Sequence, residues 1–467
     1  MKKFIALILA LVLLSLGAVI AVAASVNKNK DTLTHSERTI WGDPAFAEGA
    51  EVKSISHYQN HLVWESLYTV GEGTKTDFKF HFGKHYTNSR PRLSGFILDS
   101  DIDFGFNLNL PASEQQGLAK VYKELYDSLD YDEMGEKTIC LADYYDYYPL
   151  SITINLPTLV WNARSDSFSS GRVISNVNTQ NDKEIYDDFC EFFKIPVLDT
   201  EYVDITVTKH RRPNSVGFGH GWSDKSTDIY SLHSHATYTD KVCYIYVNNR
   251  TENGNIMDFS NVPGGYGIYA LPYEGAKLKT GELAMVYALD EKSRVSYMTV
   301  NEDYTRLLLT VVEDGASYFE VIDIATMTRL QKFKINDGTH YIVYPNEDFV
   351  AYEFEKHIAV IEEKGGVYSL AFVTDKFFDD HTDTEYFYFR SGAALDFDGE
   401  RLIVVDNLYF TGGWQDMCGF FMAVYDKNGL QYFGEYSSSL DANYDASTQY
   451  SFHCRPLGYF DVRWNGK

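Results

Sequence analysis

Short apolar runs separated by polar turns fill the C-terminal half of the chain, and one arrangement of them recurs. A polar opening turn precedes an apolar run, a second apolar run, a polar turn and a third apolar run. The three clearest copies open at 301–303, 346–348 and 396–399, so they repeat about every 45–50 residues. Apolar runs bounded by Asn, Asp and Gly are typical of β-strands. The pattern therefore predicts a repeating unit of short strands.

The repeats and the segments before them predict individual strand positions. The strands of the three copies are expected at 307–312, 318–324 and 330–335, at 349–354, 357–361 and 367–373, and at 402–405, 420–425 and 430–436. A looser copy precedes them, with strands at 242–247, 266–271 and 282–289. Strand pairs are expected further upstream for 61–70 with 76–82, 93–98 with 102–110, and 137–141 with 150–156.

Repeats of this length that contain several short strands are typical of β-propeller blades. Over residues 228–437 the chain resembles the β-propeller repeat superfamily, although no Trp-Asp dipeptide marks a WD40 blade. The resemblance implies an all-β fold, a β-propeller of about seven blades over residues 39–467. The last strands, 450–454 and 459–464, are expected to pair with the segment around Thr39 to Trp41, because such closure removes an open sheet edge.

Two helical insertions are expected in the N-terminal half. Residues 113–130 place Leu118, Val121, Tyr122 and Leu125 at helical spacing. Residues 182–193 show the same spacing of apolar side chains and are followed by Pro196. Insertions within repeats usually project from one face, which is often the binding face.

The first 24 residues form an export signal. Lys2 and Lys3 precede an uncharged run from Phe4 to Ala24, which ends in small residues of the kind a signal peptidase recognises. The main interpretation is a cleaved bacterial-type signal peptide over 1–24, followed by a linker at 25–38. The alternative is an uncleaved anchor at 4–24, because the run is long enough to span a bilayer. Either interpretation places the remaining chain outside the cytoplasm, secreted or tethered.

Composition supports β structure and excludes one class of partner. The 467 residues include 36 Tyr, 30 Phe and 6 Trp, and aromatic side chains favour strands. The 66 Asp and Glu outnumber the 41 Lys and Arg, which gives a formal net charge of −25. Nucleic acid is excluded as the main partner because phosphate binding needs a clustered basic face.

The five cysteines do not define a disulfide framework. Cys140, Cys190, Cys243, Cys418 and Cys454 are widely spaced and odd in number. Cys243 lies inside an apolar run and is expected to be a buried thiol, and a bridge between Cys418 and Cys454 is one open pairing. No C-x-x-C motif indicates a zinc or redox site.

The histidines around residue 230 are the leading metal candidates. His233 and His235 would point to the same face of a strand, because side chains alternate with period two. Two imidazoles so placed suit a metal, with His220, Asp228 or Asp240 as the third ligand. The alternative is a polar strand end whose histidines contact turn carbonyls or water.

An acidic run offers a second cation candidate. Asp99, Asp101 and Asp103 alternate as in the first half of an EF-hand calcium loop. Phe104 and Leu110 then occupy positions where that loop needs Gly and Glu, so a surface turn is the favoured interpretation and calcium the alternative. No other cofactor is predicted.

A tyrosine-rich run is the candidate ligand contact. Tyr144, Tyr145, Tyr147 and Tyr148 could stack against a sugar or a peptide. The alternative is that these rings pack within the fold.

No catalytic residue is identified, since no nucleophile elbow, zincin motif or Walker A loop occurs. The sequence therefore favours a binding or scaffold module for a protein, peptide or glycan ligand. The alternative is a propeller-type hydrolase or lyase acting on polysaccharide, an analogy at the level of the fold. A membrane is expected as a partner only through residues 4–24.

Overall fold

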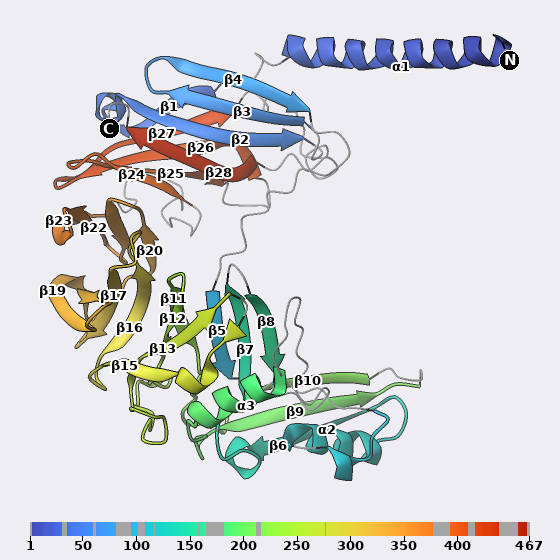
Figure 1. The fold of residues 1–467 in the computed structure, drawn as a ribbon, viewed down its shortest axis with the longest axis vertical. Coiled ribbons are helices and arrows are strands. Elements are labelled where there is room, and N and C mark those ends of the chain that lie inside the picture. Colours follow the sequence, from blue (N-terminus) through green and yellow to red (C-terminus); the bar gives the residue numbers. More distant parts are fainter. Residues whose placement is uncertain are drawn as a thin grey trace. The chain divides into compact units, whose positions relative to one another are not determined.

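The chain divides into two compact units in a computed structural model (Figure 1). One unit contains residues 1–89 and 338–467, and the other contains residues 90–337. The structure describes residues 2–29, 35–58, 62–80, 95–100, 108–115, 117–156, 159–164, 182–211, 216–275, 277–376, 393–409, 416–438 and 456–464.

Antiparallel strands dominate both units. The described residues form seven sheets of three to five strands, and none of these sheets closes on itself. The expectation of a mostly β protein is confirmed. Alternation of apolar and polar side chains within short runs explains this outcome, because one face of each sheet can then be buried.

Three sheets lie in the first unit. Their strand orders are β28-β2-β3-β4, β20-β21-β22-β23 and β1-β27-β26-β25-β24. The strands are β1 His35–Gly42, β2 Ala50–Tyr58, β3 Leu62–Thr69, β4 Gly73–Phe80, β20 Ile342–Pro345, β21 Phe349–Glu353, β22 His357–Lys364, β23 Val367–Asp375, β24 Ala394–Phe397, β25 Leu402–Tyr409, β26 Asp416–Asp426, β27 Gly429–Ser438 and β28 Pro456–Trp464. The strands predicted for the second and third repeats are confirmed. The second repeat gains the short strand β20 before its opening turn, and the third gains β24, which includes Asp396 and Phe397 of the predicted turn.

The N-terminal and C-terminal strands share sheets, but with partners other than those expected. β28 pairs with β2, where Val462 lies opposite Val52. Thr39 lies in β1, which pairs with β27 and places Thr39 opposite Gly434. The predicted pairing was wrong because a 3-10 helix, Pro44–Ala47, turns the chain between β1 and β2, so the second strand reaches β28. Residues 450–454 lie outside the described residues.

Four sheets lie in the second unit. Their orders are β5-β7-β8, β10-β9-β6, β11-β12-β13 with β14 and β15 both on β13, and β16-β17-β18-β19. The strands are β5 Gly95–Ser100, β6 Glu133–Cys140, β7 Leu150–Leu156, β8 Leu159–Arg164, β9 Tyr202–Lys209, β10 Val216–Trp222, β11 Ser234–Tyr238, β12 Val242–Val247, β13 Gly267–Glu274, β14 Lys277–Leu278, β15 Ala284–Ala288, β16 Arg294–Val300, β17 Arg306–Glu313, β18 Ala316–Asp323 and β19 Thr328–Asp337. The first repeat and the looser copy before it are confirmed.

Upstream of the repeats, β3 pairs with β4 as predicted. β6 pairs with β9, and β7 lies between β5 and β8, so the predicted pair of 137–141 with 150–156 was wrong. Local alternation cannot choose among distant partners of equal polarity. The pair of 93–98 with 102–110 stays a prediction, because 93–94 and 102–107 lie outside the described residues.

Helices occupy both expected insertions. Helix α2 (Gly117–Ser128) buries Leu118, Val121 and Tyr122, and it contacts β6 and β9. The Tyr122 hydroxyl donates a hydrogen bond to the carbonyl of Gly219 in β10 at 3.1 Å. Helix α3 is Asp182–Phe192. The helix α2 therefore covers one face of the sheet β10-β9-β6.

The first strands of three consecutive sheets in the second unit lie side by side. β11 contacts both β5 and β16. The Ser234 hydroxyl accepts a hydrogen bond from the backbone amide of Leu98 at 2.7 Å, and the Thr237 hydroxyl accepts one from Val300 at 3.2 Å. Hydroxyl side chains on β11 thus satisfy backbone groups at the edges of neighbouring sheets.

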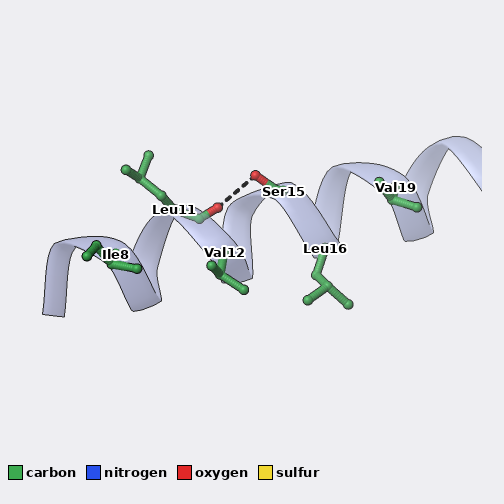
Figure 2. A pocket seen from close by; sticks show the side chains of 6 residues that line it. All are labelled: Ile8, Leu11, Val12, Ser15, Leu16 and Val19. Carbon is green, nitrogen blue, oxygen red and sulfur yellow. Dashed lines mark hydrogen bonds between the residues drawn. The ribbon is translucent and has the colours of Figure 1, made fainter. Parts of the chain in front are cut away.

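An apolar helix, α1 (Lys2–Asn29), begins the described chain. Its segment Phe4–Ala21 has a mean hydropathy of 3.0 and is long enough to cross a membrane. Figure 2 shows apolar side chains along it together with Ser15, whose hydroxyl donates to the Leu11 carbonyl at 2.8 Å. Because the polar atom is satisfied within the helix, the segment suits an apolar environment. It fits a signal sequence or an anchor.

Candidate functional site

Two histidines meet at the start of β11 in the second unit. The ring centroids of His233 and His235 lie 6.0 Å apart, with their planes nearly perpendicular. The His235 ring stacks on Tyr246 of the adjacent strand at 6.0 Å. His233 is exposed, and its Nδ1 lies 3.0 Å from the Ser231 carbonyl. The period of the strand places both imidazoles on one side.

Burial and neighbouring positive charge keep His235 neutral. Burial lowers the pKa of His235 to about 4, and His233 and Arg294 lower it further. Burial raises the pKa of the half-buried Asp99, and the nearby His233 opposes that rise. The start of β11 is therefore a cluster of titratable side chains that includes a neutral imidazole.

The structure separates the other cation candidates from this pair. His220 is exposed on β10, in a different sheet from His233 and His235. Asp101 and Asp103 lie outside the described residues. Among the residues that the structure describes, no group of three His, Cys, Asp or Glu side chains could hold a metal ion.

The tyrosine-rich run serves mainly to join elements. Tyr148 is buried, its hydroxyl accepts from the Leu198 amide at 3.3 Å, and its ring packs on Tyr230. The Tyr145 hydroxyl accepts from the Leu118 amide at 3.3 Å, at the start of α2.

The remaining two rings of the run differ in exposure. Burial raises the pKa of the half-buried Tyr144. Tyr147 is 38% exposed, and the Lys194 ammonium lies 5.9 Å from its ring centroid. Of these four side chains, Tyr147 is the exposed one.

A pocket of about 620 Å³ lies near the histidine pair, and sequence reasoning missed it. It lies between the loop after β12, the start of β16 and the turn between β17 and β18. The lining residues are Arg250, Thr251, Glu252, Gly254, Ile256, Lys292, Arg294, Val312, Asp314 and Gly315. No local motif marks it, because its charged side chains come from three separate segments. We call this set the charged pocket.

The cations of the charged pocket differ in how they are held. The Arg250 guanidinium donates to the carbonyls of Gly254 at 2.8 Å, Glu291 at 3.4 Å and Lys292 at 2.9 Å. In the part of the chain that the structure describes, the side chains of Lys292 and Arg294 donate no hydrogen bond and form no ion pair. Three positive charges therefore face the pocket without a carboxylate partner.

A buried carboxyl group lies in the same unit, and no motif in the sequence indicates it. Glu201 is fully buried, and its Oε1 accepts a hydrogen bond from the Tyr230 amide at 2.5 Å. Its Oε2 accepts no hydrogen bond from any described residue. Burial raises the pKa of Glu201 to about 7, a rise that Asp228 and Glu252 reinforce and that the Tyr230 amide and the Tyr148 hydroxyl oppose.

Comparisons with known proteins give no family for the chain. No family model matches, and no curated protein matches. Among solved structures, TolB from Acinetobacter baumannii shares 10% identity at a TM-score of 0.24, with 84% of this chain and 80% of that chain covered.

Two further solved structures show a similarly low level of likeness. A putative 6-phosphogluconolactonase from Bacteroides fragilis shares 8% identity at a TM-score of 0.27, with 84% and 95% covered. An oligogalacturonate lyase in complex with manganese shares 9% identity at a TM-score of 0.28, with 87% and 96% covered. The function therefore has to be argued from the residues of this chain.

Proposed function

We propose that the protein is an exported β-propeller that acts as a binding module for a protein, peptide or glycan ligand. The charged pocket of about 620 Å³ carries the proposal. Five charged side chains line it, and none of them forms an ion pair with any residue in the described ranges. Charged groups that converge on a concave surface without ion-pair partners are available to a ligand.

The strand orders support a propeller of six blades and one inserted sheet. Six of the seven sheets are antiparallel meanders, in which strands follow one another in chain order apart from two added edge strands, β28 on β2 and β1 on β27. The sheet β10-β9-β6 joins strands that are separated by β7 and β8, which belong to another sheet. Such a sheet is an insertion rather than a blade. The sequence favoured about seven blades.

Export rests on helix α1. Cleavage after Ala24 would release residues 25–467, whereas retention of residues 4–24 would tether the propeller to a membrane. N-terminal sequencing of the exported protein distinguishes the two forms. Recovery of the chain from the cytoplasm alone would contradict export.

The binding role is tested by arrays of glycans and peptides probed with the exported protein. The wild type is compared with the double variant Lys292→Gln/Arg294→Gln and with Lys137→Gln, which removes an exposed cation on β6. A ligand retained by the wild type and the control but lost by the double variant supports the proposal. Equal retention by all three proteins, or none by any, contradicts it. Turnover of a retained polysaccharide would favour the enzymatic alternative.

A further inference from the structure

We propose that the charged pocket binds an oxyanion, a carboxylate or phosphate group, on the ligand of this protein. The inference rests on the proposed binding function and names the chemistry that the pocket recognises. The inference is based on a difference in pairing: nearby cations on the same sheets form ion pairs with carboxylates, whereas the cations that face the pocket form none with the described residues.

Arg250 is held in place by groups that leave its charge uncompensated. Its three acceptors, the carbonyls of Gly254, Glu291 and Lys292, are neutral. A guanidinium group carries five N–H donors in a planar fork. The donors that these carbonyls do not use remain available to a carboxylate or phosphate oxygen. A cation fixed in advance loses little conformational entropy on binding.

Within the described ranges, Lys292 and Arg294 have no carboxylate partner, unlike nearby cations. In the sheet that begins with β16, Lys332 bridges Glu313 at 2.7 Å and Glu320 at 2.8 Å. Arg306 in the same sheet pairs with Asp323 at 2.8 Å. Acidic residues are abundant in a chain of net charge −25, so two unpaired cations at one pocket wall are a local exception.

The positive charge of Arg294 acts beyond its own position. Arg294 is one of the groups that lower the pKa of His235, so its field reaches the histidine pair. A neutral imidazole does not change the net charge near the pocket. The pocket therefore offers an oxyanion three cations, none of which forms an ion pair with a described residue.

The two acidic residues of the pocket limit the charge of the ligand. Asp314 and Gly315 have φ values of 48° and 79° and form the turn between β17 and β18, which accounts for an Asp-Gly pair there. Glu252 is exposed on the loop after β12. With three cations against two carboxylates, the pocket has a net charge of about +1, which suits one oxyanion group.

Isothermal titration calorimetry at low ionic strength tests the inference, because salt screens exposed charges. The probes are inorganic phosphate, succinate and, as the uncharged analogue, succinamide. The wild type and Lys137→Gln are expected to bind phosphate, succinate or both, and not succinamide. Lys292→Gln/Arg294→Gln is expected to weaken that binding at least about tenfold, the loss of more than 1.4 kcal/mol of charge-assisted contact. Phosphate alone or succinate alone identifies which oxyanion fits.

Two results would overturn the inference. One is that neither anion binds the wild type, and the other is that the double variant binds as well as the wild type while circular dichroism shows both folded. If the double variant loses an array ligand although neither anion binds, the binding function stands and the oxyanion assignment fails. If the anions bind but no array ligand is retained, the assignment stands and the proposed ligand classes fail.

Discussion

The carboxylate of Asp396 accepts a hydrogen bond from the backbone amide of Trp464 at 2.8 Å. Asp396 lies on β24 and Trp464 ends β28, so the contact joins two sheets of one unit. The Arg401 guanidinium lies 4.0 Å from the Trp464 ring centroid, and it also donates to the Phe46 carbonyl. Through these contacts the residues around β24 hold the end of β28 in place.

Asp396→Ala is expected to destabilise the unit that contains β28. The substitution leaves the half-buried amide of Trp464 without its charged acceptor, at a cost of about 1–3 kcal/mol in the free energy of unfolding. Urea unfolding followed by tryptophan fluorescence measures the change. Asp461→Ala on the same strand is the control, because the ion pair that Asp461 forms among the described residues is with the exposed Arg463, at 3.3 Å. Equal losses in the two variants would show that the contact adds no stability.

A buried ion pair between Lys376 and Glu353 gives a second prediction. Their side chains are 1% and 2% exposed, so removal of one charge leaves the other buried without its counterion. Lys376→Met is expected to lower the free energy of unfolding by about 3–5 kcal/mol. The double variant Lys376→Met/Glu353→Gln should recover much of that loss in the same urea measurement. A double variant less stable than the single one would contradict the expected coupling.

Turn chemistry explains why the repeats could be predicted from the sequence. Asp314-Gly315 adopts positive φ at both residues, and such a pair fixes both the hairpin and its register. The partners of β28 and β6 lie far away in the sequence, and no turn connects them. Their pairing depends on which strands the 3-10 helix or the inserted sheet places side by side. The alternation of apolar and polar side chains does not determine this choice of partner.

The candidate site was predictable only where it follows strand geometry. His233 and His235 are neighbours because side chains two residues apart share a face of a strand. Arg250 and Arg294 belong to different segments of the chain. Arg250 is held by backbone carbonyls, which residues of every type carry, so no sequence motif reveals the contact. The raised pKa of Glu201 likewise results from burial. The sequence around a single Glu in a polar stretch does not indicate that its side chain will be buried.

Arg294→Gln is expected to raise the pKa of His235, which burial, His233 and Arg294 lower to about 4. Because the folded pKa lies below the ordinary value of 6.5, the neutral imidazole contributes stability above about pH 6.5 that is lost as the pH falls towards 4. Histidine ring signals followed by NMR across that range give the pKa in both proteins. An unchanged value in Arg294→Gln would show that the charge of Arg294 does not reach the imidazole.

Glu201→Gln is expected to flatten the pH dependence of stability between pH 5 and 8. Burial raises the pKa of Glu201 from 4.5 to about 7, so the folded chain binds a proton there that the unfolded chain releases. This contribution to stability is fully present below about pH 4.5 and is lost as the pH rises through 7. At pH 8 the wild type should therefore be less stable than Glu201→Gln by up to about 3 kcal/mol.

Tyr148, Asp228 and Glu252 face the same carboxyl group, and each is unchanged in the variant. Thermal unfolding at a series of pH values makes the comparison, with Glu136→Gln on the exposed face of β6 as the control. A wild type whose stability rises from pH 5 to 8 relative to Glu201→Gln would show that the carboxyl group is ionised when buried.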